Sequence, residues 1–311
     1  MPGQIGVPCD IAIPQVFHDD PVDMDLVRRH VETAEAMGYH GIWVQERFIG
    51  ESPTLEGLSL LSYVAALTKN VRLGTSVVVA PNHNPAHLAK QFSTIDQMSQ
   101  GRLTIGLGLG GRPQNDNLMG GATERRVRYF VEGLQVMKAL WQEPKANHHG
   151  HFWNLEDVEM EPKPVQKPHP PVWFGGRHPN ALIRAVRHGN GWMGAGSSST
   201  EQFKQHVATL QETMESTGRD PATFAISKRI YLAIDDNEAR AEGRLREWFG
   251  RHYGNTDMGS QVSVWGSASH CAEALAEIVD GGAQMLMLNP VFDHMEHLDG
   301  LKQALNFPDA K

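Results

Sequence analysis

Residues 71–112 read VRLGTSVVVAPNHNPAHLAKQFSTIDQMSQGRLTIGLGLGGR. Two short β-rich runs, LGTSVVVA and GRLTIGLGLGG, flank one amphipathic helical pattern. Both runs end in small or turn-forming residues, which are typical of places where the backbone lies against a ligand. The stretch therefore predicts two strands joined by a helix, with strand ends that face a binding site.

The same alternation of short apolar strands and longer amphipathic helices continues in both directions along the chain. Eight such units in one direction are the number that closes a TIM barrel, the (β/α)8 fold. A doubly wound parallel sheet is the alternative, but the first strand–helix turn lacks a glycine-rich dinucleotide fingerprint. Strands are predicted at 5–13, 41–48, 72–80, 103–109, 172–175, 191–194, 224–234 and 284–288. Helices are predicted at 23–37, 58–68, 85–98, 124–141, 179–188, 200–216, 237–252 and 268–280.

Two regions interrupt the regular pattern of short connections. An insertion is predicted near 142–171, where prolines at 162, 164, 168, 170 and 171 forbid a helix and indicate an extended segment on the surface. Residues 251–266 are rich in Gly, Ser and Asn and are predicted to form a loop near the barrel mouth. Because α/β barrels commonly reach this size as one unit, we expect a single domain over residues 1–311.

Composition restricts the class of function. Hydrophobic residues make up 40% of the chain and charged residues 21%, as in an ordinary globular protein. A net charge of −8 disfavours nucleic acid and anionic membranes as partners. The two cysteines imply no disulfide framework, and neither a signal peptide nor a transmembrane run is recognisable, so we expect a cytoplasmic protein.

Two neighbouring strand ends supply candidate residues for contact with a flat ligand. The first is the end of the GTSV run, Ser76 and Val77, and the second is the end of the GLGLGG run, Gly110 and Gly111. Active sites of TIM barrels lie at the C-terminal ends of the strands, which favours a functional reading. The alternatives are that β-branched residues are simply good strand formers and that the glycines serve tight internal packing.

Gly175, Gly176 and Arg177 stand between a predicted strand and a helix that begins near residue 179. Free N–H groups at a helix start, the helix dipole and an arginine together favour a phosphate site, although a plain tight turn is the alternative. Glu46 and Arg47 follow the second strand. They are candidate contacts to substrate or cofactor, or else a solvated pair on the barrel rim.

The chain has 16 histidines, and the densest clusters are HHGH at 148–151 and HMEH at 294–297. Neither cluster has the H-E-x-x-H order of zinc proteases, and we expect no catalytic metal. No nucleophile elbow of the G-x-S-x-G type and no P-loop occurs, so serine hydrolase and NTPase functions lack support.

Several segments together resemble the bacterial-luciferase-like family of flavin- and deazaflavin-dependent oxidoreductases. The matching runs extend from near the start of the chain to near its end. They are MGYHGIWVQERF (37–48), residues 71–111, ERRVRYFVEGLQVMKALW (124–141), EPKPVQKPHPPVWFGG (161–176), GNGWM (189–193) and GGAQMLMLNP (281–290). The NPAHLAK…DQMSQGR and PKPVQKPHPPVWFGG runs are highly specific to the family.

The resemblance implies a TIM barrel that binds a flavin-type ring at its C-terminal face. It implies a non-prolyl cis peptide at Ser76–Val77 behind the ring, as in members that use the deazaflavin F420, and a phosphate cradle at Gly175 and Gly176. Many members have an acidic residue followed by histidine after strand two, where this chain has Glu46 and Arg47. Arg47 and Arg112 would make the mouth basic, which suits an acidic cofactor tail or an anionic substrate.

The resemblance thus leads us to expect an F420-dependent oxidoreductase that transfers a hydride between the deazaflavin and a small organic substrate. The first alternative is an FMN-dependent monooxygenase that is supplied by a separate reductase. The second is a carrier of flavin or F420 that does not turn over. Homodimers are common in the family, so a homodimer is possible here.

Overall fold

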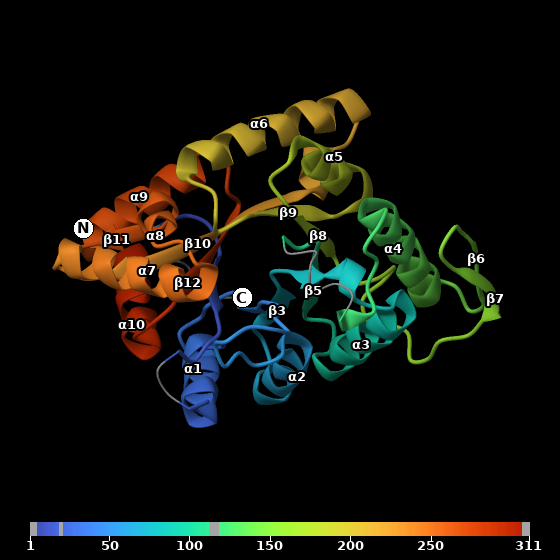
Figure 1. Ribbon diagram of the computed structural model, residues 1–311, viewed down its shortest axis with the longest axis horizontal. Coiled ribbons are helices and arrows are strands. Elements are labelled where there is room, and N and C mark those ends of the chain that lie inside the picture. Colours follow the sequence, from blue (N-terminus) through green and yellow to red (C-terminus); the bar gives the residue numbers. More distant parts are fainter. Residues whose placement is uncertain (1–4, 19–20, 112–117, 307–311) are drawn as a thin grey trace.

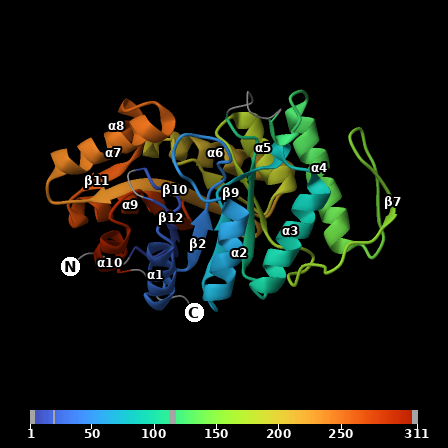
Figure 2. The same ribbon diagram turned by 60° about the horizontal axis from the view of Figure 1, so that its bottom comes forward.

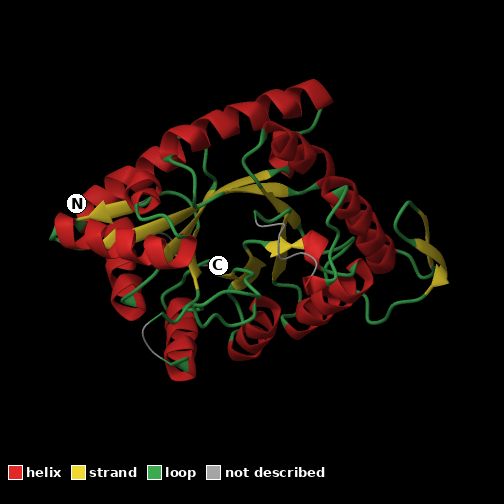
Figure 3. Ribbon diagram, in the orientation of Figure 1, coloured by secondary structure: helices red, strands yellow, loops and turns green. Residues whose placement is uncertain are grey.

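The computed structural model describes residues 5–18, 21–111 and 118–306 of the chain. Eight parallel strands close into a barrel, because β10 pairs both with β9, through Ala225–Lys228, and with β12, through Ser227–Leu232. The predicted TIM barrel is confirmed, and the helices surround it (Figures 1 and 3). The barrel strands are β1 (Cys9–Ala12), β2 (Gly41–Val44), β3 (Arg72–Thr75), β5 (Leu103–Gly108), β8 (Val172–Gly175), β9 (Gly191–Gly194), β10 (Ala225–Ile234) and β12 (Met285–Pro290).

Most of the helices begin where the sequence supplies a side-chain cap. The side chain of Asn84 accepts hydrogen bonds from Ala86 N and His87 N, and proline at the first helical position needs no hydrogen-bond acceptor for its nitrogen. Ser199 and Gln202 form a capping box at the start of the helix Thr200–Thr217. The helices are α1 (Met24–Ala36), α2 (Gly57–Leu67), α3 (Pro85–Met98), α4 (Arg126–Gln142), α5 (Pro179–His188), α6 (Thr200–Thr217), α7 (Glu238–Tyr253), α8 (Asp257–Val262), α9 (Ala268–Asp280) and α10 (His294–Leu305), with short 3-10 turns η1 (Ala80–Asn82) and η3 (Pro221–Thr223).

The C-terminal third differs from the sequence prediction. The expected loop at 251–266 holds the end of α7, the short helix α8 and the strand β11 (Val264–Gly266), which pairs with the outer end of β10. The helix α9 belongs to this added segment and precedes β12. The helix that completes the eighth unit is α10, which was not predicted because its HMEH start was considered only as a possible metal cluster.

The insertion begins with a two-stranded antiparallel hairpin, β6 (Ala146–His149) and β7 (Asn154–Val158), which stands off beside α4 (Figure 2). Beyond it the proline-rich segment has no regular structure and lies along α3. Lys90 Nζ donates to Glu161 O, Ser93 Oγ to Pro162 O, and Gln97 Nε2 to Lys163 O, the last at 2.7 Å. The extended surface segment is thus confirmed for this part, whereas the hairpin was not foreseen.

The predicted strand at 72–80 is interrupted. It ends as β3 at Thr75 and resumes as the two-residue β4 (Val78–Val79), with a cis peptide bond between Ser76 and Val77, as the family resemblance implied. Ser76 N donates to Val44 O of β2 at 2.7 Å, and β4 then pairs with β5. The chain therefore keeps β5 as a neighbour on both sides of the break, whereas its strand pairing with β2 ends at Thr75.

A separate cluster fills the barrel interior. It consists of Ala12, Trp43, Met193, Met285 and Met287 with Trp173 packed against it, and it draws only on strands. Gly74 is required beside it, because a Cβ atom there would lie 2.3 Å from the Trp43 ring. A larger hydrophobic cluster lies between the strands and the surrounding helices. The barrel is thus a packed core, and only its C-terminal end is left for a ligand.

Two buried histidines make the stability of this fold dependent on pH. His30 of α1 and His294 of α10 lie with ring centroids 6.0 Å apart. Burial, and then the neighbouring His294, holds the pKa of His30 well below its ordinary value, and burial followed by His297 lowers the pKa of His294 to about 4. Both side chains are therefore neutral in the folded protein at neutral pH.

We expect the free energy of unfolding to fall as the pH drops below about 6.5, because the unfolded chain then binds protons that the folded chain excludes. The loss from His294 alone amounts to about 2 kcal/mol at pH 5 and levels off below its folded pKa. Urea unfolding at pH 7.5 and pH 5 measures it. A His30→Leu/His294→Leu variant should show a smaller decrease than a His149→Leu control at the exposed hairpin turn. An equal decrease in both variants would contradict the assignment.

Candidate functional site

One cleft with a volume of about 410 Å³ opens at the C-terminal ends of the barrel strands. Six of the nine residues proposed from the sequence line it, whereas Gly175, Gly176 and Arg177 are not among the lining residues; Arg112 lies outside the described residues. The lining comprises Gln45, Glu46, Arg47, Phe48, Ile49, Ser76, Val77, Val79, Asn82, Gly110, Gly111, Met119, Arg126, Arg229, His252 and Tyr253.

Val77 explains two of the glycines near this cleft. A Cβ atom at Gly108 would lie 2.6 Å from Val77 Cγ2, and one at Gly175 would lie 2.9 Å from Val77 Cγ1. Gly108 therefore serves tight internal packing, which was the alternative stated for the GLGLGG run, and Gly175 packs against the same side chain. Gly111 differs, because a Cβ atom there would meet nothing within 4 Å. Gly111 borders open space in the cleft.

Glu46 is held in a fixed position by two neighbours. Its Oε1 accepts from Val79 N at 3.0 Å, and its Oε2 lies 2.6 Å from His83 Nε2. The Glu46 side chain is only 3% exposed, so it does not belong to a solvated rim. His83 was missed in the sequence, although its place three residues after the predicted strand 72–80, in the NHNP run, was a usable signal.

Arg47 turns away from Glu46 and toward α7. Its Nη1 lies 3.0 Å from His252 Nδ1 and donates to His252 O at 3.1 Å. The His252 ring stacks on Trp248 with centroids 4.4 Å apart. Because the guanidinium can only donate, His252 Nδ1 is the acceptor of this contact. The predicted alternative of a Glu46–Arg47 rim pair is wrong, since the two side chains bind different histidines.

Arg229 of β10 contacts residues that directly follow two other strands, β2 and β3. Its Nη1 donates to Ser76 O at 3.2 Å, its Nη2 donates to Gln45 Oε1 at 2.8 Å, and its guanidinium lies 4.8 Å from the centre of the Tyr231 ring. Tyr231 in turn shares a 2.5 Å hydrogen bond with the hydroxyl of Tyr253. Arg229 was not predicted, because nothing near 229 in the sequence marks it as facing the mouth.

Three buried polar atoms at this cleft have no hydrogen-bond partner within the described part of the chain. They are Ser76 Oγ, Asn82 Oδ1 and Arg229 Nε. A buried polar group without a partner costs free energy, and a ligand in the cleft would supply the missing partners of all three atoms. The set contains a hydroxyl that can donate or accept, a carbonyl acceptor and an N–H donor. The cleft therefore suits a ligand with a polar edge.

The glycine–arginine turn after β8 is built differently from the sequence expectation. Gly176 has φ of +139°, and its carbonyl accepts from Trp192 Nε1 at 2.9 Å. His178 caps α5 and accepts from Asn180 N, so the first-turn N–H groups are not all free. Arg177 is exposed and donates to Ser197 O at 3.2 Å. A phosphate site at this turn stays a prediction.

The neighbouring loop after β9 is fixed by a buried lysine. Lys228 Nζ donates to Ala195 O and to both oxygen atoms of Ser198, at 2.5 to 2.8 Å. Burial, and then the charges of Arg229 and Arg177, lowers the pKa of Lys228 to about 7. Positive groups thus gather on this side of the barrel mouth even though the chain as a whole is acidic.

The histidine clusters occupy other parts of the fold. His148, His149 and His151 lie in and beside the β6–β7 hairpin, and His294 and His297 lie in α10. Over residues 5–18, 21–111 and 118–306, no group of three or more His, Cys, Asp and Glu side chains is placed to hold a metal ion. Within the same residues, no helix combines the length and the apolar character that crossing a membrane requires.

Comparison with known proteins agrees with this architecture. The chain is 28% identical over 226 residues to an F420-dependent glucose-6-phosphate dehydrogenase of Kineococcus radiotolerans, covering 69% of this chain and 66% of that protein. It is 28% identical over 237 residues to the oxygenase component of a flavin-dependent trigonelline monooxygenase of Acinetobacter baylyi, covering 72% and 63%. The matches thus span about two thirds of the length of these relatives.

Among solved structures, an F420-dependent secondary alcohol dehydrogenase with an F420–acetone adduct superposes with a TM-score of 0.84 at 19% identity, over 96% of this chain and 99% of that one. At this identity the likeness concerns the fold. The description "luciferase-like monooxygenase" belongs to the family model that matches residues 9–256. Since that match covers most of the chain, this protein is a member of the luciferase-like family, whose relatives found here use either F420 or a flavin.

Proposed function

We propose that this protein binds F420 in the cleft at the barrel mouth and transfers a hydride between the deazaflavin and a small organic substrate. The observation that carries the proposal is the set of three unpartnered polar atoms, Ser76 Oγ, Asn82 Oδ1 and Arg229 Nε, which line one cleft. The pyrimidine edge of a flavin-type ring carries two carbonyl oxygens on either side of an N–H group. Such an edge offers acceptors to Ser76 and Arg229 and a donor to Asn82.

The charge of the cleft supports the more acidic of the two cofactors. Arg47, Arg126 and Arg229 line it against the single carboxylate of Glu46. F420 carries a phosphate and further carboxylates, whereas FMN carries the phosphate alone. The relative from Kineococcus radiotolerans, which is named as F420-dependent, supports the same choice. We assign the phosphate to the turn at Gly175, Gly176 and Arg177, where Arg177 offers a charge-assisted contact.

When bound, the cofactor supplies the centre that carries the hydride. The protein binds and orients the cofactor and excludes water from the site. Glu46 and Arg47 are the proposed substrate-side residues. Arg47 cannot act as a base, because its guanidinium stays protonated and only donates hydrogen bonds. Glu46 and His83 share a 2.6 Å contact, through which His83 positions the carboxylate.

An FMN-dependent monooxygenase that is supplied by a separate reductase is the second candidate. It is favoured by the relative from Acinetobacter baylyi, which matches at the same identity as the F420-dependent one. The three unpartnered atoms of the cleft fit a flavin ring equally well, since the pyrimidine edge is common to both cofactors. The acidic tail is therefore what separates the two candidates.

Fluorescence titration with F420 and, separately, with FMN tests the choice. We expect saturable micromolar binding of F420 and none of FMN at the same concentration. Binding of FMN alone would favour the FMN-dependent monooxygenase. Binding of neither cofactor would refute both candidate functions. Reduced or oxidised F420 that stays unchanged with every substrate offered would identify a carrier without turnover.

Ser76→Ala tests the polar edge without disturbing the fold. Because Ser76 Oγ has no partner in the described chain, its removal should leave the urea midpoint unchanged, yet F420 affinity should fall roughly three- to tenfold, which is the value of one hydrogen bond of about 0.5–1.5 kcal/mol. Ser263→Ala is the matched control, since Ser263 Oγ is also buried and unpartnered but does not line the cleft. Equal affinities of the two variants would remove Ser76 from the site.

His83→Ala tests the Glu46–His83 pair. The change removes one of the two partners of a buried carboxylate, so we expect the free energy of unfolding to drop by about 2–3 kcal/mol. His87→Ala, at an exposed position of α3, should change it by less than about 0.5 kcal/mol. Denaturant unfolding of the two variants under identical conditions measures both effects. A His83 variant as stable as the His87 control would mean that the pair contributes nothing.

A further inference from the structure

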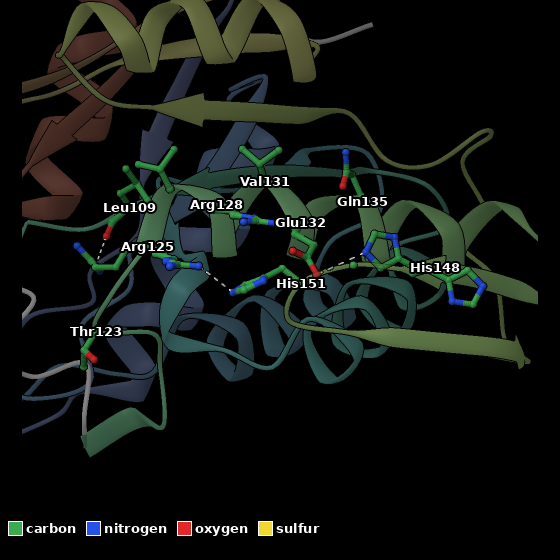
Figure 4. A pocket seen from close by; sticks show the side chains of 13 residues that line it. Leu109, Thr123, Arg125, Arg128, Val131, Glu132, Gln135, His148 and His151 are labelled. Atoms are coloured by element: carbon green, nitrogen blue, oxygen red, sulfur yellow. Dashed lines mark hydrogen bonds and ion pairs between the residues drawn. The ribbon is translucent and has the colours of Figure 1, made fainter.

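A second hollow lies outside the cleft, between the first turns of α4 and the turn that joins β6 to β7. Its volume is about 1170 Å³, and Figure 4 shows the side chains that line it. We call it the α4 groove, and its lining consists of Leu109, Thr123, Arg125, Arg126, Val127, Arg128, Val131, Glu132, Gln135, His148, His149, Gly150 and His151. The function proposed above makes no use of it.

The α4 groove is positively charged in a protein whose net charge is −8. Its lining holds three arginines and one carboxylate, which is a net charge of +2 with the three histidines neutral. Arg125 contacts His151 Nε2 at 3.1 Å rather than a carboxylate. Throughout the described residues, no ion pair joins a carboxylate to Arg125 or Arg128. The guanidinium groups of Arg125 and Arg128 are thus available to an anion from outside the chain.

The single carboxylate of the groove is already engaged. Glu132 Oε1 accepts from Phe152 N at 2.7 Å and Trp153 N at 3.1 Å, and it lies 3.7 Å from His148 Nε2. Burial opposes the ionisation of Glu132, but the backbone N–H groups outweigh it and keep its pKa below the ordinary value. Glu132 therefore fixes the hairpin turn against α4. Figure 4 shows it pointing toward His148, away from Arg125.

The α4 groove adjoins the cleft. Arg126 lines both hollows, and its Nη2 donates to the carbonyl oxygen of Leu109, a groove residue directly before Gly110 and Gly111 of the cleft. A molecule that occupies the cleft can therefore extend past Arg126 into the groove. Its extension would meet Arg125 and Arg128 on α4 and the histidines of the hairpin turn.

We propose that the α4 groove binds a chain of carboxylate or phosphate groups that extends from the molecule in the cleft. The site itself follows from the geometry and charge of the groove, and only the identity of the molecule in the cleft rests on the function proposed above. Guanidinium groups suit this ligand, because each binds a carboxylate or phosphate through paired N–H donors. Two sources have the required chemistry, the acidic tail of the cofactor and an acidic substrate.

The first experiment needs no cofactor. Tripolyphosphate and tri-γ-glutamate are titrated by calorimetry into the full-length wild-type protein, where we expect saturable binding. In Arg125→Ala/Arg128→Ala, affinity should fall at least roughly tenfold, since two charge-assisted contacts are lost. Arg28→Ala/Arg187→Ala is the matched control, because it removes the same charge from exposed positions of α1 and α5. No saturable binding to the wild type, or an equal loss in the control, would overturn the proposal.

A second experiment identifies the source. F420 with a long glutamate chain and its form without glutamate are titrated into the wild type and into Arg125→Ala/Arg128→Ala. A loss of affinity confined to the long-chain form assigns the groove to the cofactor tail, whereas equal affinities assign the anion site to the substrate. Because the first experiment uses the anions alone, failure of F420 to bind would refute the proposed cofactor. It would not change the result of the anion titrations, which test the α4 groove by themselves.

Discussion

Closure of the parallel barrel is the constraint on which the other features depend. Strand β10 has ten residues, and it pairs with β9 through Ala225–Lys228 and with β12 through Ser227–Leu232. Because all barrel strands run in the same direction, closure brings the residues after β2, β3 and β5 to one end of the molecule. Arg229 can contact Ser76 and Gln45 only because the sheet closes.

The polar chemistry at this end is organised in pairs that join segments far apart in the chain. Glu46 binds His83, Arg47 binds His252, and Arg229 binds the backbone of Ser76. Each pair fixes one wall of the cleft. The unpartnered atoms Ser76 Oγ and Asn82 Oδ1 belong to residues that line the same cleft, so the site combines fixed side chains with unmet hydrogen-bonding capacity. Preorganised donors and acceptors of this kind bind a ligand without a further cost of ordering.

The insertion and the barrel contribute to one continuous basic surface. The hairpin β6–β7 places its histidines opposite the arginines of α4, and Arg126 carries the positive charge from there into the cleft. A protein with a net negative charge thus presents a basic surface at the mouth of its barrel. Such a reversal of sign concentrates anionic ligands where they bind.

The sequence by itself determined the strand–helix alternation, the family and, through the family resemblance, the cis peptide at Ser76–Val77, because these depend on local periodicity and specific motifs. It placed Glu46, Arg47 and Gly111 at the mouth correctly, since residues after barrel strands share one end. Only the tertiary structure decided that Glu46 binds His83, that Arg47 binds His252, and that Val77 occupies the space left by Gly108 and Gly175. These contacts join segments far apart in the chain, and nothing in local sequence periodicity specifies which distant side chain fills a given space or completes a given hydrogen bond.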